Sequence, residues 1–264
     1  MKLKMTPHPI PRYLSKPSFY FLITILLFAL FVPAPFAIIS PGPVTNLLSK
    51  GMKISGDSER QTSGKLLSLS VFVNNPDSRP PGILVLRAWL RGDSVVLPNE
   101  IVYAEGETTK VAAARGKKDM ESSEQLAAIA AANFLKQAHP DEPLNWKLSD
   151  INFVMKNVGG PSAGLAFALS LIAKLSNPEL IAGRTIAVTG TITESGLVGG
   201  IGGIDQKLLS ARSAGATIAV IPQVNCQDIT VKTDGLKIIA VKNLNEAFHG
   251  LLSPTIAKSL RCSS

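Results

Sequence analysis

Apolar residues recur with two different spacings along this chain of 264 residues. Runs rich in branched and aromatic residues, bounded by Asn, Pro or Gly, predict strands at 66–73, 83–90, 151–156, 185–191, 217–221 and 237–241. Apolar positions three and four residues apart predict helices at 120–136, 162–175, 204–214 and 244–251. We expect the first two strands to pair as antiparallel neighbours. Strands and helices alternate from 151 onward, which predicts an α/β (α+β) layered fold.

The longest uncharged stretch of the chain lies near its N-terminus. No charged residue occurs at 17–49, and 19–39 is almost wholly apolar, close to the roughly 20 residues with which a helix crosses a bilayer. The residues before it include four basic side chains and no acidic one, so the positive-inside rule predicts a cytoplasmic N-terminus and an extracytoplasmic remainder. The alternative is a cleaved signal peptide, because small residues near Ala34 and Ala37 offer a cleavage position.

Charge, histidines and cysteines exclude several other classes. The net charge of +8 does not indicate nucleic acid, since four positive charges lie in the N-terminal flank and the others are scattered. The histidines lie far apart, and we expect neither a metal nor a cofactor. The glycine-rich segment 196–203 matches no nucleotide-binding pattern. Cys226 and Cys262 are too few for a disulfide framework; they either pair in an oxidising compartment or stay as two thiols.

Two segments carry the candidate chemistry: GGPSAG at 159–164, and Lys207 at the start of a predicted helix, 45 residues after Ser162. Ser162 opens a helix that is apolar nearly all round and therefore buried. The backbone N–H groups of Ala163 and Gly164 lie beside it and would stabilise an oxyanion. Lys207 lies beside the apolar stripe of its own helix, where burial would lower the pKa of its amine and let it take a proton from the serine.

Thr189, on the predicted strand 185–191, is a third candidate, because its hydroxyl would orient the lysine amine by a hydrogen bond. Each of these residue types also has an ordinary structural role. A serine near such a turn caps a helix, a helix lysine is usually solvated, and a threonine suits a strand. The hypothesis therefore depends on the three side chains meeting in the fold.

These segments together resemble the proteolytic domain of the Lon protease family over about 151–245. The motifs that carry the resemblance are PSAG around Ser162, TGTIT at 189–193 and IGG before the helix of Lys207. The resemblance implies Ser162 as the nucleophile, Lys207 as the general base and Thr189 as a residue that contacts the lysine. It further implies a serine endopeptidase that acts on proteins or peptides, and subunits that often assemble into rings.

Four further features resemble the membrane-anchored Lon-like peptidases, which lack an ATPase and usually carry a PDZ domain. They are the apolar N-terminal segment, PGP at 41–43, Gly-Gly before Pro161, and Asn225 followed by Cys226. They imply an ATP-independent enzyme, tethered to the cell membrane, that cleaves extracytoplasmic or membrane-associated proteins. In those relatives the PDZ domain lies where this chain has only about 139–149, so the route of substrate recruitment is open. A proteolytically inactive, membrane-tethered binding or scaffold protein is the alternative, and a nucleotide-dependent enzyme is a third.

The predicted organisation has seven parts. They are a cytoplasmic basic segment at 1–17, a transmembrane anchor at 18–40, a linker at 41–64, a small strand-and-helix module at 65–136, a short linker at 137–150, the Lon-like proteolytic domain at 151–252 and a tail at 253–264.

Overall fold

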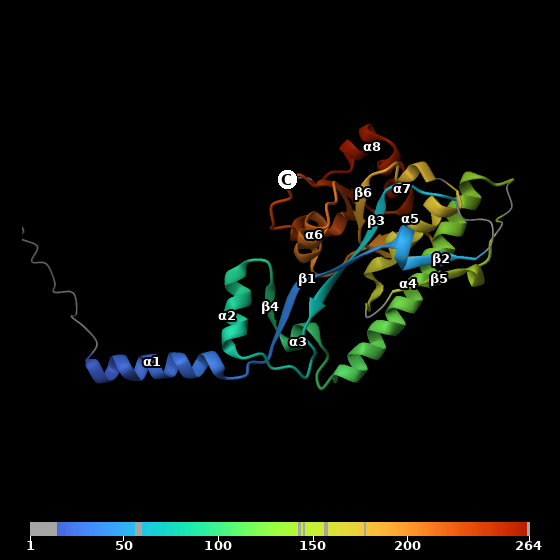
Figure 1. The fold of residues 1–264 in the computed structure, drawn as a ribbon. Coiled ribbons are helices and arrows are strands. Elements are labelled where there is room, and N and C mark those ends of the chain that lie inside the picture. Colours follow the sequence, from blue (N-terminus) through green and yellow to red (C-terminus); the bar gives the residue numbers. More distant parts are fainter. Residues whose placement is uncertain are drawn as a thin grey trace, which may run out of the picture.

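The computed structural model describes residues 15–55, 60–141, 144, 146–155, 158–176 and 178–262 (Figure 1). Its α-helices are α1 (Lys16–Phe31), α2 (Gly82–Arg91), α3 (Asn99–Val102), α4 (Thr109–Ala138), α5 (Gly164–Leu175), α6 (Ile204–Ser213), α7 (Leu244–Leu252) and α8 (Pro254–Ser259). Its strands are β1 (Phe36–Asn46), β2 (Met52–Ile54), β3 (Lys65–Val73), β4 (Val95–Pro98), β5 (Ile151–Phe153), β6 (Thr185–Val188), β7 (Thr191–Ile192), β8 (Val198–Gly199), β9 (Ile218–Pro222) and β10 (Lys237–Val241).

A mixed six-stranded sheet forms the centre of the molecule, in the order β10-β9-β6-β3-β1-β4. The strands β10, β9, β6 and β3 pair in parallel, whereas β1 pairs antiparallel with both β3 and β4. Two short antiparallel pairs, β2 with β5 and β7 with β8, lie outside this sheet. Sheet and helices together fit the expected α+β fold class.

Different helices cover the two faces of the sheet. Leu66, Ile186 and Val188 belong to the larger core, in which α5 packs together with α4 and α7. Their chain neighbours Leu67 and Ala187 belong to the opposite core, against the apolar side of α6. This is the alternation that an extended strand produces. The sheet therefore lies between α5, which carries the predicted nucleophile at its head, and α6, which carries the predicted base.

One expected strand is a helix. The segment 83–90 forms most of α2, which begins after Pro81 and ends at Gly92, a residue with a φ of 67°. A short apolar run suits either structure, and here the proline and the glycine at its two ends favour the helix. The antiparallel partner of β3 is consequently β1 rather than this segment.

The expected membrane helix at 18–40 is wrong in its extent. The helix α1 ends at Phe31, because Pro33 and Pro35 follow and lack the backbone N–H that a helix needs. Residues 36–40 of the expected span belong to β1 and pair within the sheet. In the part of the chain that the structure describes, we find no helix with the length and apolarity that a bilayer crossing requires.

The sheet also joins segments that the sequence assigned to separate parts. β1 runs through the first residues of the expected linker at 41–64, and β3 comes from the expected small module, yet β1 pairs with β3 and β3 pairs with β6 in one sheet. The helix expected at 120–136 is longer than predicted, since α4 begins at Thr109. In the tail, Cys262 forms a disulfide with Cys226. Most of the expected basic segment at 1–17 lies outside the described residues.

Candidate active site

Ser162 lies in a tight turn at the head of α5. The turn is a 3-10 segment (Pro161–Ala163) that follows Gly160, whose φ of 92° is one that glycine adopts without strain. Positions 164 to 174 of α5 are all buried, so the helix is fixed in the core. The carbonyl oxygen of Ser162 accepts a hydrogen bond of 2.8 Å from the N–H of Gly190. The serine backbone is therefore tied to the end of β6, while the residue keeps partial contact with solvent.

Lys207 lies in the first turn of α6 and reaches the serine from the other side of the sheet. Its Nζ donates a hydrogen bond of 2.9 Å to Ser162 Oγ. Lys207 is only 2% exposed, and this burial lowers the pKa of its amine from 10.5 to about 8. The heads of α5 and α6 thus meet near the carboxyl end of β6, the edge at which parallel α/β sheets usually hold their ligands.

Thr189, which directly follows β6, contacts the backbone of the serine. Its Oγ1 donates a hydrogen bond of 3.2 Å to the carbonyl oxygen of Ser162, and its N–H donates one of 3.1 Å to the carbonyl oxygen of Val220. Thr189 is fully buried. The sequence predicts that this hydroxyl orients the lysine amine, whereas in the structure its proton holds the turn that carries the serine.

One of the two N–H groups expected to face an oxyanion is used inside the turn. The N–H of Gly164 donates to the carbonyl oxygen of Pro161. Gly164 is also tightly packed, since a Cβ there would lie 2.8 Å from Ile192 Cγ2 and 2.9 Å from Ser123 Oγ. Of the two groups, the N–H of Ala163 is therefore the remaining candidate, and its role toward an oxyanion stays a prediction.

The helix α4 supports the serine turn through residues that the sequence analysis missed. The carbonyl oxygen of Gly116 accepts a hydrogen bond of 2.8 Å from the N–H of Gly160, and Ser123 Oγ donates one of 3.0 Å to the carbonyl oxygen of Pro161. A Cβ at Gly159 would lie 3.0 Å from the Gly116 backbone, so helix and turn touch where neither has a side chain. An isolated glycine within a helical pattern is a usable signal, but the predicted helix began only at 120.

Ser162 and Lys207 line a cavity of about 110 Å³, and most of the other lining residues have apolar side chains. The wall residues come from β1, β3, α4, the segment before the serine turn and the turn itself: Pro43, Leu69, Ser70, Val71, Phe72, Met120, Val158, Gly159 and Ala163. Among these lining residues Lys207 alone has an ionisable side chain. Burial in this wall disfavours the charged form of the amine and lowers its pKa, and no other ionisable side chain of the described lining offsets that effect.

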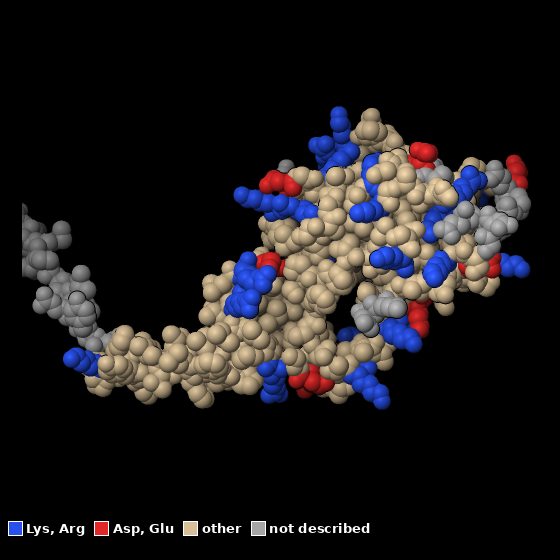
Figure 2. Space-filling view, viewed as in Figure 1, with Lys and Arg blue, Asp and Glu red and all other residues tan. Residues whose placement is uncertain are grey.

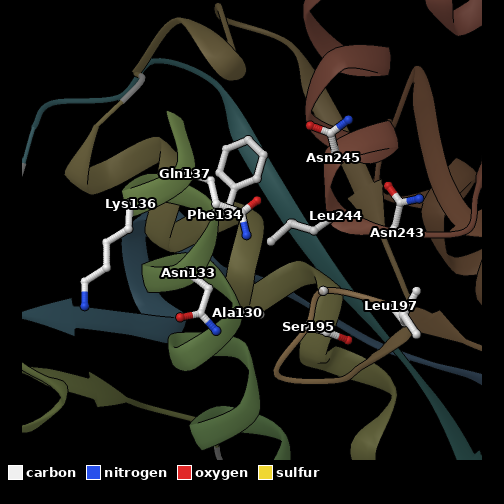
Figure 3. A pocket seen from close by; sticks show the side chains of 11 residues that line it. Ala130, Asn133, Phe134, Lys136, Gln137, Ser195, Leu197, Asn243, Leu244 and Asn245 are labelled. Carbon is white, nitrogen blue, oxygen red and sulfur yellow. The ribbon is translucent and has the colours of Figure 1, made fainter. Parts of the chain in front are cut away.

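A larger cavity of about 660 Å³ lies between the second half of α4, the loop after β7 and the start of α7 (Figure 3). Neither Ser162 nor Lys207 lines it. Its amides take part in the fold, since Asn133 donates to a loop carbonyl oxygen and Asn243 caps α7. The nucleophile, the base and the shifted pKa all belong to the smaller cavity, so we take that cavity as the candidate active site. The described residues include no group of three or more His, Cys, Asp or Glu suited to a metal ion.

Comparison with known proteins agrees with the resemblance read from the motifs. The sequence model of the Lon protease (S16) C-terminal proteolytic domain matches residues 90–254. Lon protease 2 of Bacillus subtilis is 38% identical over 95 residues, which are 36% of this chain and 17% of that protein. The Lon proteases of Azorhizobium caulinodans and Mycoplasma genitalium are 30% and 31% identical over 182 and 181 residues, covering 65% and 66% of this chain.

The matched region spans about a fifth of the length of these relatives, 17% to 22%. On this chain, the family match begins within α2 and includes the serine turn, β6, α6 and the strands β9 and β10. It therefore contains both Ser162 and Lys207 and more than half of all the residues. The chain belongs to the Lon protease family, through its C-terminal proteolytic domain.

Proposed function

We propose that this protein is a serine endopeptidase that hydrolyses peptide bonds of proteins by means of Ser162 and Lys207. The observation that carries the proposal is the 2.9 Å between Lys207 Nζ and Ser162 Oγ in a cavity that keeps the amine away from water. A serine hydroxyl is a weak nucleophile at neutral pH unless an adjacent base accepts its proton. A lysine whose pKa is lowered to about 8 is partly neutral near that pH and serves as such a base.

The reaction proceeds in two halves. In the first, neutral Lys207 takes the proton of the Ser162 hydroxyl while Oγ bonds to the peptide carbonyl carbon, and the resulting oxyanion is stabilised by backbone N–H groups such as that of Ala163. The C–N bond then breaks, and the protonated lysine gives its proton to the leaving amine. In the second half water attacks the acyl-enzyme, Lys207 accepts the water proton, and the proton returns to Ser162 Oγ as the acid leaves.

Substitution of the serine is the direct test. With an unfolded protein as the substrate, Ser162→Ala is expected to lower kcat/KM by at least about 10³-fold. Ser213→Ala, at an exposed position of α6, is the matched control and is expected to keep full activity. Unchanged cleavage by Ser162→Ala would exclude this mechanism.

The pH dependence tests the base. Because only the neutral amine accepts a proton, kcat/KM is expected to rise as pH increases through about 8, the lowered pKa of Lys207. Below that pH the rate should fall by about tenfold per unit, as the neutral fraction does. A profile that is flat between pH 6 and roughly 9 would show that another group, or none, takes the proton.

We further propose that the peptidase acts without ATP. The sequence contains no GxxxxGK pattern followed by Ser or Thr, and its glycine-rich segment 196–203 forms β8 and the lead into α6 instead of a phosphate loop after a strand. Addition of ATP with Mg²⁺ to the 264-residue chain is expected to leave the cleavage rate unchanged. A rate increase that depends on nucleotide would contradict this part of the proposal.

A binding or scaffold protein without peptidase activity is the second candidate. The observation that favours it is the short stretch at about 139–149, where the related membrane-anchored peptidases carry a PDZ domain. Serine-directed acylating reagents separate the two candidates. A peptidase is expected to be labelled at Ser162 and at no other serine, and Lys207→Ala should prevent the labelling. A scaffold protein would be labelled in neither form.

We also propose that the apolar surface of α1 and α2 attaches the protein to a membrane. No residue of α1 is buried, and Figure 2 shows most of its length without a charged side chain. α2 adds Trp89 and Leu90, which are 71% and 69% exposed. The N-terminal flank carries Lys and Arg without acids, which suits anionic headgroups. An extracytoplasmic position of the active site, and assembly of subunits into a ring, stay predictions.

Trp89 offers a direct measurement of membrane attachment. The chain has two tryptophans, so Trp146→Phe leaves Trp89 as the only one. On addition of anionic lipid vesicles its fluorescence is expected to shift to shorter wavelength, because the indole moves from water into an apolar layer. The full chain should also float with the vesicles. Absence of both effects, with a stable soluble oligomer instead, would show that a second copy covers this surface.

A further inference from the structure

The strand β1 contains a bulge that lies directly under α6. Pro41 pairs with Val71 and Val44 pairs with Leu69, so two residues of β1 face the single residue Ser70 of β3. Such a bulge bends a strand and turns a peptide group out of the ladder. At its centre a Cβ on Gly42 would lie 2.7 Å from the backbone of β3, and a glycine is therefore needed there.

The turned peptide group of the bulge contacts α6. The carbonyl oxygen of Gly42 accepts a hydrogen bond of 3.0 Å from Ser210 Oγ. Ser210 is 5% exposed and lies three residues after Lys207, so the two side chains share one face of the helix. Ser70 Oγ holds the next residue of the bulge by donating a hydrogen bond of 2.6 Å to the carbonyl oxygen of Pro43.

The bulge also forms part of the wall around the lysine amine. Pro43 lines the small cavity together with Leu69 and Val71 of β3. At the N-terminal end of α6, a Cβ on Gly203 would lie 2.9 Å from Val71 Cγ1, so the first turn of the helix rests on β3. Lys207 is therefore held between two contacts of α6 with the sheet, one at Gly203 and one at Ser210.

We infer that Ser210 is a positioning residue for Lys207: through its hydrogen bond to Gly42 it holds α6 against the β1 bulge and keeps the lysine amine enclosed by apolar wall. The inference rests on the proposed peptidase function for its effect on rate, but its geometric part concerns the environment of the amine alone. Packing of this helix face does not require a hydroxyl at position 210, because Leu208 and Ala211 already supply the apolar contacts.

Few other charged groups face Lys207. The facing part of β1 has no ionisable residue, and on β3 only Lys65 at its start is ionisable. The charged side chains of α6 and of the following segment Gln223–Asp228 are hydrogen-bonded to other groups. Asp205 pairs with Thr230, Arg212 with the carbonyl oxygen of Lys232, and Asp228 with Asn225. On α4, which supplies Met120 to the cavity, the acids are Asp119, Glu121 and Glu124, and burial raises the pKa of Glu124 to about 7.

The test compares two serines of the same helix. Ser210→Ala is expected to open the cavity to water and to move the midpoint of the kcat/KM profile upward by about one pH unit, which lowers the rate at pH 7 by about tenfold. Ser213→Ala, at an exposed position three residues on, should keep the original midpoint. Ser210→Thr retains the hydroxyl and should stay within about twofold of the unchanged protein. The same comparison in Glu124→Gln removes a carboxyl whose pKa is raised to about 7.

A titration that does not require turnover separates this inference from the peptidase proposal. The chemical shift of Lys207 Cε, followed by NMR with ¹³C-labelled lysine, reports the amine pKa in the full protein, and a rise in Ser210→Ala is expected. If the protein cleaves nothing but this rise occurs, the peptidase proposal fails and the positioning role holds. If the protein cleaves and Ser210→Ala changes only thermal stability, with both midpoints unmoved, Ser210 is an ordinary structural residue and the inference is overturned.

Discussion

The helices α1 and α5 are both apolar nearly all round, yet only α5 is buried. Positions 164 to 174 of α5 have no solvent-exposed side, whereas no residue of α1 is buried and Phe28 is 72% exposed. A helix that is apolar all round needs a cover. Other elements of the chain cover α5 and thereby fix Ser162, but the described residues do not cover α1. The same sequence pattern thus gives Ser162 a fixed support in one place and, in our proposal, a membrane-attachment surface in the other.

The largest difference in the free energy of unfolding should appear when a phenylalanine of each helix is replaced by alanine. Phe167→Ala removes a fully buried ring that packs 4.5 Å from the ring of Phe153, and it is expected to lower the free energy of unfolding by about 3–5 kcal/mol. Phe28→Ala on α1 should change it by less than about 0.5 kcal/mol. Urea unfolding of both variants measures the difference. Equal losses would mean that α1 is covered by the folded chain in solution.

The buried Lys207 amine acts on stability in the opposite direction to the buried ring of Phe167, because it destabilises the fold. Burial lowers the pKa of Lys207 from 10.5 to about 8, so between these pH values the unfolded chain binds a proton that the folded chain lacks. The free energy of unfolding therefore rises with pH across this window. Below about pH 8 both states are protonated, and the buried charge destabilises the fold by on the order of 3 kcal/mol.

Lys207→Met is accordingly expected to raise the free energy of unfolding at pH 7 by roughly 1–3 kcal/mol while it abolishes cleavage. The rise of stability between pH 8 and 10.5 should disappear in this variant. Lys242→Met, at an exposed lysine, is the matched control and should change neither property. A Lys207→Met variant that is less stable than the unchanged protein at pH 7 would show that the amine is not held in an unfavourable environment.

Much of this site could be predicted from the sequence because its parts are local. The helix of Ser162 and the strand before Thr189 each show their own periodicity, and the two motifs name the side chains that meet. The serine turn is bound to the end of β6 through Gly190, and α6 follows the same strand after the β7-β8 pair, which brings Ser162 and Lys207 together. Chemistry that is carried by short motifs on regular elements therefore survives errors elsewhere in the fold.

The parts that could not be predicted depend on contacts between distant segments. β1 was hidden in an uncharged stretch with four prolines at 33–43, which looked like the end of an anchor and a linker, and its place in the sheet is decided by β3. α2 was missed because a short apolar run suits strand and helix alike. The support of the serine turn by Gly116 joins residues 44 apart and leaves only one glycine as a sequence signal.

The contact between α4 and the serine turn gives a third, smaller effect. Gly159→Ala would place a Cβ 3.0 Å from the Gly116 backbone, so the turn must shift against the helix. We expect a loss of about 1–2 kcal/mol in the free energy of unfolding and a larger decrease in kcat than in KM, because the serine moves relative to the lysine. Gly202→Ala has open space around the added methyl group and is the control. Equal kinetics for both variants would show that the turn does not need its contact with α4.

The smallest effect on folding should accompany the clearest loss of attachment. Phe28→Glu places a charge on a side chain that is 72% exposed, so the free energy of unfolding is expected to stay within about 0.5 kcal/mol of the unchanged protein. Cleavage of a soluble substrate should also be unaffected, because α1 contributes nothing to the cavity of Ser162 and Lys207. Binding to anionic vesicles should fall by about tenfold or more, since a carboxylate in an apolar layer is strongly disfavoured. Thr24→Glu, on the same helix, gives the same result if α1 enters the lipid on all sides, whereas retention of binding by both variants would assign attachment to α2 alone.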